Sequence, residues 1–165
     1  MSVIAKAVAN GFFDIARQKG EALTPMKLQK LVYFAHGWHL ALKKEPLVSE
    51  PVEAWPFGPV FPVLYHEFKH YGDSPICEPA TDLDPDGMVW EWTTPAISEN
   101  DTYKRTLLEK IWNVYGDYSA IQLSNLTHTP GSPWHQISQR YGGTIPRRVA
   151  IPNEIIQAYF SSLTA

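Results

Sequence analysis

The sequence predicts a mainly α-helical fold, a single compact multi-helix domain over residues 1–165 with a small two- or three-stranded β element. Apolar residues recur at three- and four-residue steps through most of the chain, as on the buried face of a helix. Ser, Thr, Asp or Pro precedes many of these segments, in the positions typical of helix starts. Strand-like patterns are confined to two short stretches, residues 51–55 and 88–92.

Two helices are expected at the N-terminus. The first begins with Ser2 as its N-cap and ends before Gly20, a residue suited to the left-handed position after a helix. The second begins with Thr24 as N-cap and Pro25 at its first position, and it ends near Lys44. Its apolar residues make it the expected central, buried helix of the domain.

The middle of the chain is expected to change direction sharply. Proline is too frequent in residues 47–57 for a long strand, so this segment suits a short edge strand and a bend. Gly58 and Pro59 then form a rigid corner with Trp55, since proline fixes φ and glycine permits unusual angles. A third helix is predicted over 60–71.

Turn residues dominate the segment from residue 72 to 95. Within it, residues 88–92 alternate like a half-buried strand. We expect this strand to pair with the strand at 51–55.

The C-terminal part is expected to be helical again. Four helices are predicted from their caps: one from Asn100 or Asp101 through Tyr115, one over 121–126 capped by Ser119, one from Ser132 to about 141–143, and one after Pro152.

Composition narrows the functional classes. A formal net charge of −3 provides no basic field, so nucleic acid is an unlikely partner. No run of eighteen apolar residues occurs, so no membrane span is expected, and a cytoplasmic location is predicted. One cysteine, Cys77, excludes an internal disulfide framework.

A zinc-protease pattern, H-E-x-x-H, occurs at His66, Glu67 and His70. A zinc-dependent hydrolase using these three residues is therefore one alternative function. A helical wheel places Leu64 and Phe68 on the buried side and His66 opposite them, away from any cleft where zinc would meet substrate. We favour a chance pattern on a solvated helix face, and hence no enzyme, no metal and no cofactor.

Three ordered blocks are more distinctive than this pattern. They are LTPMKLQKLVYFAHGWHLAL at 23–42, EAWPFGPVFPVLYHEFKHYG at 53–72, and LSNLTHTPGSPWHQ at 123–136. Together they resemble the Panacea domain family of SocA-like antitoxins, which often occurs as phage-associated proteins. The matching residues expected to have structural roles are Thr24, Pro25, Gly58, Tyr71, Gly72, Pro133 and Trp134.

The resemblance implies an antitoxin that neutralises a cognate protein toxin, encoded by an adjacent gene, through direct protein–protein binding. Masking of the toxin and its delivery to a cellular protease both remain open as mechanisms. A phage or prophage adaptor module without a dedicated toxin is the other alternative.

A toxin-binding surface is expected where rim residues combine large contact area with polar groups. Tyr33 and His36 in particular are expected to be exposed on the rim of the second helix, whereas Trp55 and Trp134 are expected to serve first as packing anchors. The candidate contact residues are Lys27, Lys30, Tyr33, His36, Trp55, Phe57, Pro59, His66, Lys69 and His70.

Overall fold

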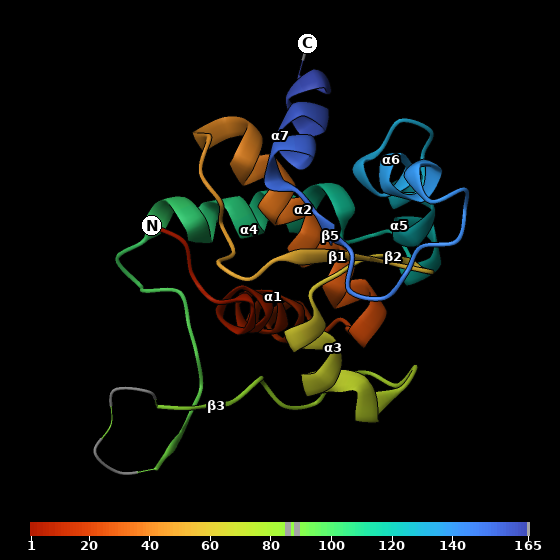
Figure 1. Ribbon diagram of the computed structural model, residues 1–165. Coiled ribbons are helices and arrows are strands. Elements are labelled where there is room, and N and C mark those ends of the chain that lie inside the picture. Colours follow the sequence, from red (N-terminus) through yellow and green to blue (C-terminus); the bar gives the residue numbers. More distant parts are fainter. Residues whose placement is uncertain (85–86, 88–89, 165) are drawn as a thin grey trace.

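A computed structural model describes residues 1–84, 87 and 90–164 of the protein (Figure 1). Its helices are α1 (Ala5–Lys19), α2 (Pro25–Lys43), α3 (Pro62–Phe68), the short 3₁₀ helix η1 (Lys69–Tyr71), α4 (Thr102–Tyr115), α5 (Ala120–Thr127), α6 (Pro133–Arg140) and α7 (Asn153–Ser162). Its strands are β1 (Val52–Trp55), β2 (Gly58–Val60), β3 (Asp82–Leu83), β4 (Trp92–Thr93) and β5 (Ala150–Ile151). The predicted mainly α fold with a small β element is confirmed.

Helix α2 lies at the centre of the fold, and α1, α3, α4, α5, α7 and β2 all contact it (Figure 1). Its predicted cap and ends are confirmed: Thr24 is the N-cap, Pro25 follows, and Lys44 ends the helix. Gly37 permits the close approach of α7, because a Cβ there would overlap the ring of Phe160. Nearly every side chain between residues 28 and 41 is buried as a result.

The start of α1 differs from the prediction. Ile4 is the N-cap and the helix begins at Ala5, whose N–H donates to the Glu50 carboxylate at 2.6 Å. Ser2 is not the cap because the next residue, Val3, forms a parallel β-bridge with Val48. The predicted end is confirmed, since Gly20 adopts a left-handed φ of 66°.

The three-stranded sheet has the order β2–β1–β5, with both neighbouring pairs antiparallel. Pro56 and Phe57 connect β1 to β2 as a two-residue hairpin turn, because Trp55 pairs with Gly58. The corner at Gly58 and Pro59 is therefore a strand and not a break.

The predicted pairing of residues 88–92 with the strand at 51–55 is wrong. Both edges of β1 are occupied by β2 and β5, and β4 pairs with β3 instead. Trp92 is 70% exposed, so β4 is not half-buried, while Met88 and Val89 lie outside the described residues.

The segment after η1 is held far from β1 by the side-chain amide of Asn10 in α1. This amide donates to the carbonyls of Ala80 (3.0 Å) and Pro95 (2.8 Å), and its oxygen accepts from the Ala80 N–H (2.7 Å). These bonds satisfy buried backbone groups that no strand neighbour reaches. These hydrogen bonds explain why the segment 72–97 lies against α1.

The predicted helix over 60–71 is shorter in the structure. Val60 belongs to β2, and Phe61 remains extended as the N-cap of α3. The reason is Gln29 of α2, whose side-chain amide donates to the Phe61 carbonyl at 3.0 Å and accepts from the Phe61 N–H at 2.9 Å. Helix α3 ends at Phe68, where η1 begins.

The C-terminal helices begin close to the predicted positions. Their N-caps are Asp101 for α4, Ser119 for α5 with a complete capping box, Ser132 for α6, and Pro152 for α7. None of the helices in the described part of the chain is both long and apolar enough to cross a membrane.

Candidate partner-binding site

The hairpin β1–β2 and the adjacent α3 present a mostly apolar surface to solvent. We call this the hairpin surface, and its residues are Trp55, Pro56, Phe57, Tyr65 and Lys69. Phe57 at the turn is 70% exposed, and Tyr65 on α3 is 44% exposed. The rings of Trp55 and Tyr65 pack edge to face with their centroids 4.8 Å apart, which links the hairpin to α3.

The back of the hairpin is fastened to α5 and α6, near its tip (Figure 1). The indole N–H of Trp134 donates to the Trp55 carbonyl at 2.6 Å, and the Ser124 hydroxyl donates to the Phe57 carbonyl at 2.9 Å. The two carbonyls flank the turn, so the tip is held in one conformation while its side chains remain exposed. Such pre-ordering reduces the entropic cost of binding.

Two hollows lie on either side of the hairpin, and Trp55 and Pro56 line both of them. The first, here called the α2 hollow, measures about 280 Å³ and lies between the start of α2, the hairpin and α3. The second, the arginine hollow, measures about 530 Å³ and is bordered by His66, Arg147 and Arg148. The hairpin surface thus offers a ridge between two concavities.

Four of the predicted contact residues are exposed and belong to this region or its edge: Phe57, His66, Lys69 and His70. Trp55 is half-buried, which agrees with its expected role as a packing anchor. Lys27 is also half-buried, and its ammonium group donates to the Gly116 carbonyl at the end of α4.

The predicted exposure of Lys30, Tyr33 and His36 is wrong, and Pro59 is buried as well. Lys30, Tyr33 and His36 are buried because other elements surround α2, and Pro59 is buried because β2 packs against α2 and α5. Tyr33, for example, packs edge to face against Phe160 of α7. The side chains of these four residues are therefore not part of the exposed hairpin surface.

His36 has a structural role in the interior. Its Nδ1 accepts from the Val48 N–H at 3.2 Å, which leaves Nε2 protonated to donate to Asn153 Oδ1 at 2.9 Å. Burial lowers the pKa of His36 to about 4, so the ring is neutral at pH 7. It joins α2 to the segment before β1 and to the start of α7.

Lys30 lies behind β2, at the floor of the α2 hollow. Its side chain is 1% exposed, and its ammonium group donates to the Pro59 carbonyl at 3.1 Å. Burial lowers the pKa of Lys30 to about 8. Among the residues that the structure describes, no acid forms an ion pair with it.

The zinc-protease pattern does not form a zinc site. The Glu67 carboxylate is held by Lys6 of α1 at 2.8 Å, so it faces the interior and not the two histidines. His66 lies on α3, whereas His70 lies on η1, so the regular helical spacing is interrupted between them. Within residues 1–84, 87 and 90–164, no three His, Cys, Asp or Glu side chains are close enough to hold a metal ion.

The expected structural residues occupy turns and helix starts. Thr24 and Pro25 begin α2, and Gly58 is the first residue of β2, with a φ of 115°. Tyr71 ends η1 and Gly72 follows it. Pro133 begins α6, and Trp134 packs on His128. A side chain on Gly58 would also lie 2.7 Å from the Thr127 hydroxyl. This position therefore needs glycine for both backbone and space.

Sequence reasoning missed three contributors to the site. Gln29 and the neighbouring Lys30 interrupt an apolar helical face, and an amide at an inward position could have indicated a buried clamp. Tyr65 is not among the candidate contact residues, although it is exposed. Arg147 and Arg148 are not among them either, and their place beside the hairpin depends on the pairing of β5 with β1.

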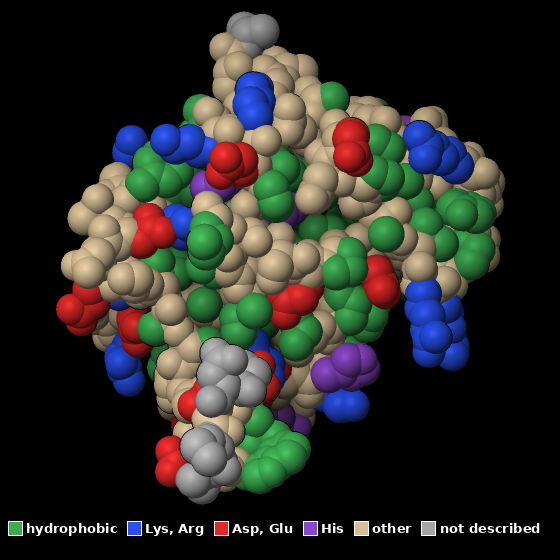
Figure 2. All heavy atoms as spheres, turned by 60° about the vertical axis from the view of Figure 1, so that its left-hand side comes forward, with side chains coloured by type: hydrophobic (Ala, Val, Ile, Leu, Met, Phe, Trp, Pro, Cys, Tyr) green, Lys and Arg blue, Asp and Glu red, His purple; other side chains and the backbone are tan. Residues whose placement is uncertain are grey.

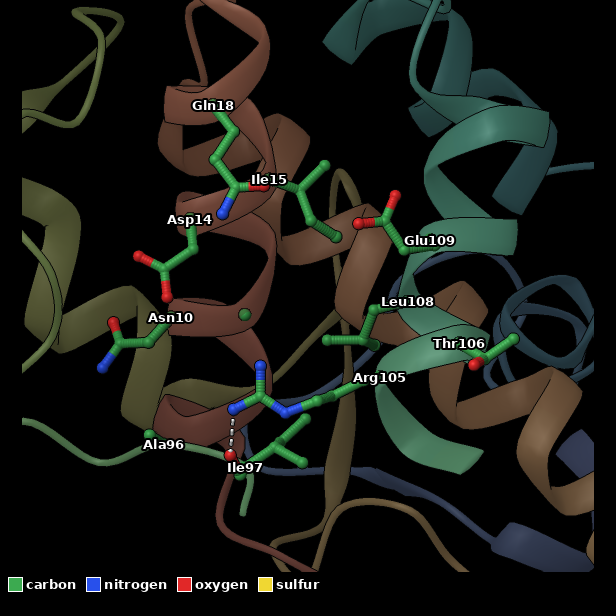
Figure 3. A pocket seen from close by; sticks show the side chains of 11 residues that line it. Asn10, Asp14, Ile15, Gln18, Ala96, Ile97, Arg105, Thr106, Leu108 and Glu109 are labelled. Atoms are coloured by element: carbon green, nitrogen blue, oxygen red, sulfur yellow. Dashed lines mark hydrogen bonds between the residues drawn. The ribbon is translucent and has the colours of Figure 1, made fainter. Parts of the chain in front are cut away.

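A third hollow, of about 350 Å³, lies between α1 and α4 (Figure 3). Asp14 and Gln18 line one wall and Glu109 the other, while Arg105 reaches from α4 toward Ile97 and donates to the carbonyls of Ile97 and Ser98. The cation near these acids is therefore already engaged. This hollow is more polar than the hairpin surface and shows no aromatic side chain.

The charges elsewhere are mixed. On the face shown in Figure 2, Lys and Arg side chains alternate with Asp and Glu and with apolar groups, without a field of one sign. A surface of this kind gives no electrostatic track for a nucleic-acid backbone.

Comparison with known proteins identifies the family. A family model described as antitoxin SocA-like, Panacea domain, matches residues 28–135, which include most of α2, the hairpin, α3 and the start of α6. The chain is also 35% identical to Antitoxin SocA of Caulobacter vibrioides (strain NA1000 / CB15N) over 159 residues, covering 96% of this chain and 83% of that protein. No solved structure matches the chain. The chain therefore belongs to the SocA-like antitoxin family with its Panacea domain.

Proposed function

We propose that this protein is an antitoxin that neutralises a protein toxin by binding it directly, and that the hairpin surface makes the central contacts. Membership of the SocA-like family supports the antitoxin role and implies a toxin as partner. No catalytic constellation is needed for this function. Direct binding requires only a complementary surface that is stable before the partner arrives.

The observation that carries the choice of surface is the exposed Phe57 on a firmly held turn. Phe57 lines the α2 hollow, and Trp55 and Pro56 before it line both hollows, so Phe57 can insert into a partner whose side chains fill the hollows. Because Trp134 and Ser124 already fix the turn, little conformational freedom is lost on binding. Exposed aromatic groups on loosely held segments lack this advantage.

The antitoxin role is tested by co-expression with the toxin encoded beside this gene. We expect the wild-type protein to restore growth and to co-purify with the toxin. Toxin half-life during rescue then separates the two mechanisms, since masking leaves the toxin stable and delivery to a protease shortens its life. If growth is not restored and the proteins do not co-purify, the proposed function is wrong.

The surface is tested with two matched variants, Phe57→Ser and Trp92→Ser. Both side chains are 70% exposed, so each change should alter the free energy of unfolding by less than about 0.5 kcal/mol. We expect Phe57→Ser to weaken toxin binding by at least about tenfold, as for a central interface residue, and Trp92→Ser to leave it unchanged. Calorimetric titration measures both, and equal effects of the two changes would contradict the assigned surface.

A further inference from the structure

A buried lysine without an acidic partner is costly. Moving an ammonium group from water into an apolar interior is unfavourable unless an anion and several hydrogen bonds compensate for it. Lys30 has three N–H donors, and the hydrogen bond described for its ammonium group is the one to the Pro59 carbonyl. A methionine or leucine would fill the same space without this cost.

The surroundings of Lys30 do not provide the missing anion. The titratable groups around it are Lys27 and Tyr33 on α2, Tyr65 on α3, Lys69 on η1, Asp73 beyond η1, and His128 at the end of α5. Asp73 is the acid among them, and it forms no ion pair with Lys30. Lys30 and Lys69 both line the α2 hollow, so the floor and rim favour an anion from outside.

The hollow above Lys30 has the shape and lining for a short peptide segment. Its walls are largely apolar, with Met26, Val60, Leu64 and Tyr65 around the floor. A volume of about 280 Å³ accommodates a few side chains. Exposed Phe57 and Tyr65 continue the apolar surface beyond the mouth, so a chain that crosses the mouth gains contact on both sides.

We propose that the α2 hollow binds an acidic side chain of the partner, flanked by apolar residues, and that the buried Lys30 ammonium group pairs with its carboxylate. This inference rests on the proposed function for the identity of the partner as a toxin. It specifies the chemistry of the contact: a Glu or Asp that enters the hollow between apolar neighbours. The hydrogen bond to Pro59 then orients the ammonium group, and the partner's carboxylate receives its other protons.

The pairing has a defined dependence on pH. Before binding, Lys30 is mostly protonated at pH 7, because its pKa of about 8 lies above that pH. A bound carboxylate raises this pKa, so binding above pH 8 requires uptake of a proton. Affinity for an acidic peptide should therefore fall from pH 7 to pH 10, whereas affinity for a neutral analogue should not follow the charge of Lys30.

The experiment uses the ¹⁵N-labelled full chain and two synthetic peptides, acetyl-Ala-Leu-Glu-Leu-Ala-amide and the same peptide with Gln in place of Glu. At pH 7 we expect the Glu peptide to bind about tenfold more tightly, with shifts centred on the amides of Gly58 and Val60. The Lys30→Met variant should bind both peptides equally. Lys69→Met is the matched control and should retain the preference.

Three results would overturn the inference: equal binding of the two peptides to wild type, a preference that survives in Lys30→Met, or a preference lost in Lys69→Met alone. If Lys30→Met does not fold, the pH 7 to pH 10 titration of wild type decides the question. Toxin rescue by wild type tests the antitoxin role separately, and the peptide preference does not depend on it.

Discussion

The two halves of α2 both bury polar side chains, but they do so in different ways. In the C-terminal half, His36 is neutral and uses both ring nitrogens, and His39 bonds to the Glu45 carbonyl at 2.7 Å. In the N-terminal half, Gln29 is fully paired with Phe61, but Lys30 is a cation with one backbone acceptor. The polar side chains of the C-terminal half therefore have a structural role, whereas the N-terminal half holds a charge that the fold itself does not compensate.

Within one helix, some buried polar side chains therefore stabilise the fold, whereas Lys30 is suited to binding a partner. A polar group whose partners all lie in the fold stabilises the fold. A buried charge whose partner is absent destabilises the fold and becomes favourable when a partner supplies the opposite charge. We therefore expect removal of His36 to lower the stability of the fold and removal of the Lys30 charge to raise it.

The largest effect is expected for His36→Ala. The change removes two hydrogen bonds that join α2 to Val48 and Asn153, and it leaves a cavity where the ring stood. We expect the free energy of unfolding to fall by about 4 kcal/mol, measured by urea denaturation at pH 7. The exposed His66→Ala serves as the control and should change it by less than about 0.5 kcal/mol.

The pH dependence of stability should distinguish the two residues by the pH range in which each acts. His36 has a pKa of about 4 when folded and about 6.5 when unfolded, so the unfolded state binds more protons between these values. Stability is therefore lost as the pH falls from 6.5 to 4, by about 3 kcal/mol from this residue. Urea titrations of wild type and His36→Gln should differ by about this amount in their acid loss.

Lys30 acts in the same direction as His36 but in a higher pH window. The pKa of Lys30 is about 8 in the folded state and 10.5 in the unfolded state. The unfolded state therefore binds more protons between these values, and the contribution of Lys30 to stability rises as the pH increases from 8 to 10.5. Below pH 8 the buried charge costs about 3 kcal/mol, and Lys30→Met should unfold at higher urea concentration than wild type at pH 7. A loss of stability in this variant would mean that the hydrogen bond to Pro59 outweighs the cost of the buried charge.

A smaller effect is expected for Gln29→Ala. The change leaves the buried N–H and C=O of Phe61 without partners, and we expect a loss of about 2 kcal/mol. Hydrogen exchange should accelerate at the Phe61 amide, and toxin binding should weaken because β2 is less firmly held. Gln18→Ala, at an exposed position of α1, is the matched control, and an equal effect there would exclude a clamp role for Gln29.

The positions of most helices, most of their caps and the family could be predicted from the sequence, with the start of α1 and of α3 as exceptions. Thr24 with Pro25, Ser119, and Ser132 with Pro133 begin helices through local chemistry that acts within a few residues, so their positions can be predicted without the fold. The exposed side of α3 was predictable for the same reason, since helical periodicity places His66 opposite Leu64 and Phe68.

Only the tertiary structure decided which residues form the site. The sequence pattern predicts that Lys30, Tyr33 and His36 lie at the exposed edge of α2. Their burial depends on contacts of α2 with α5, α7 and β2, which are distant in the sequence. The extended conformation of Phe61 follows from Gln29, 32 residues earlier, and the start of α1 depends on Glu50, 45 residues later. Such long-range contacts leave no periodic signal, because the partner of each group is chosen by packing and not by spacing along the chain.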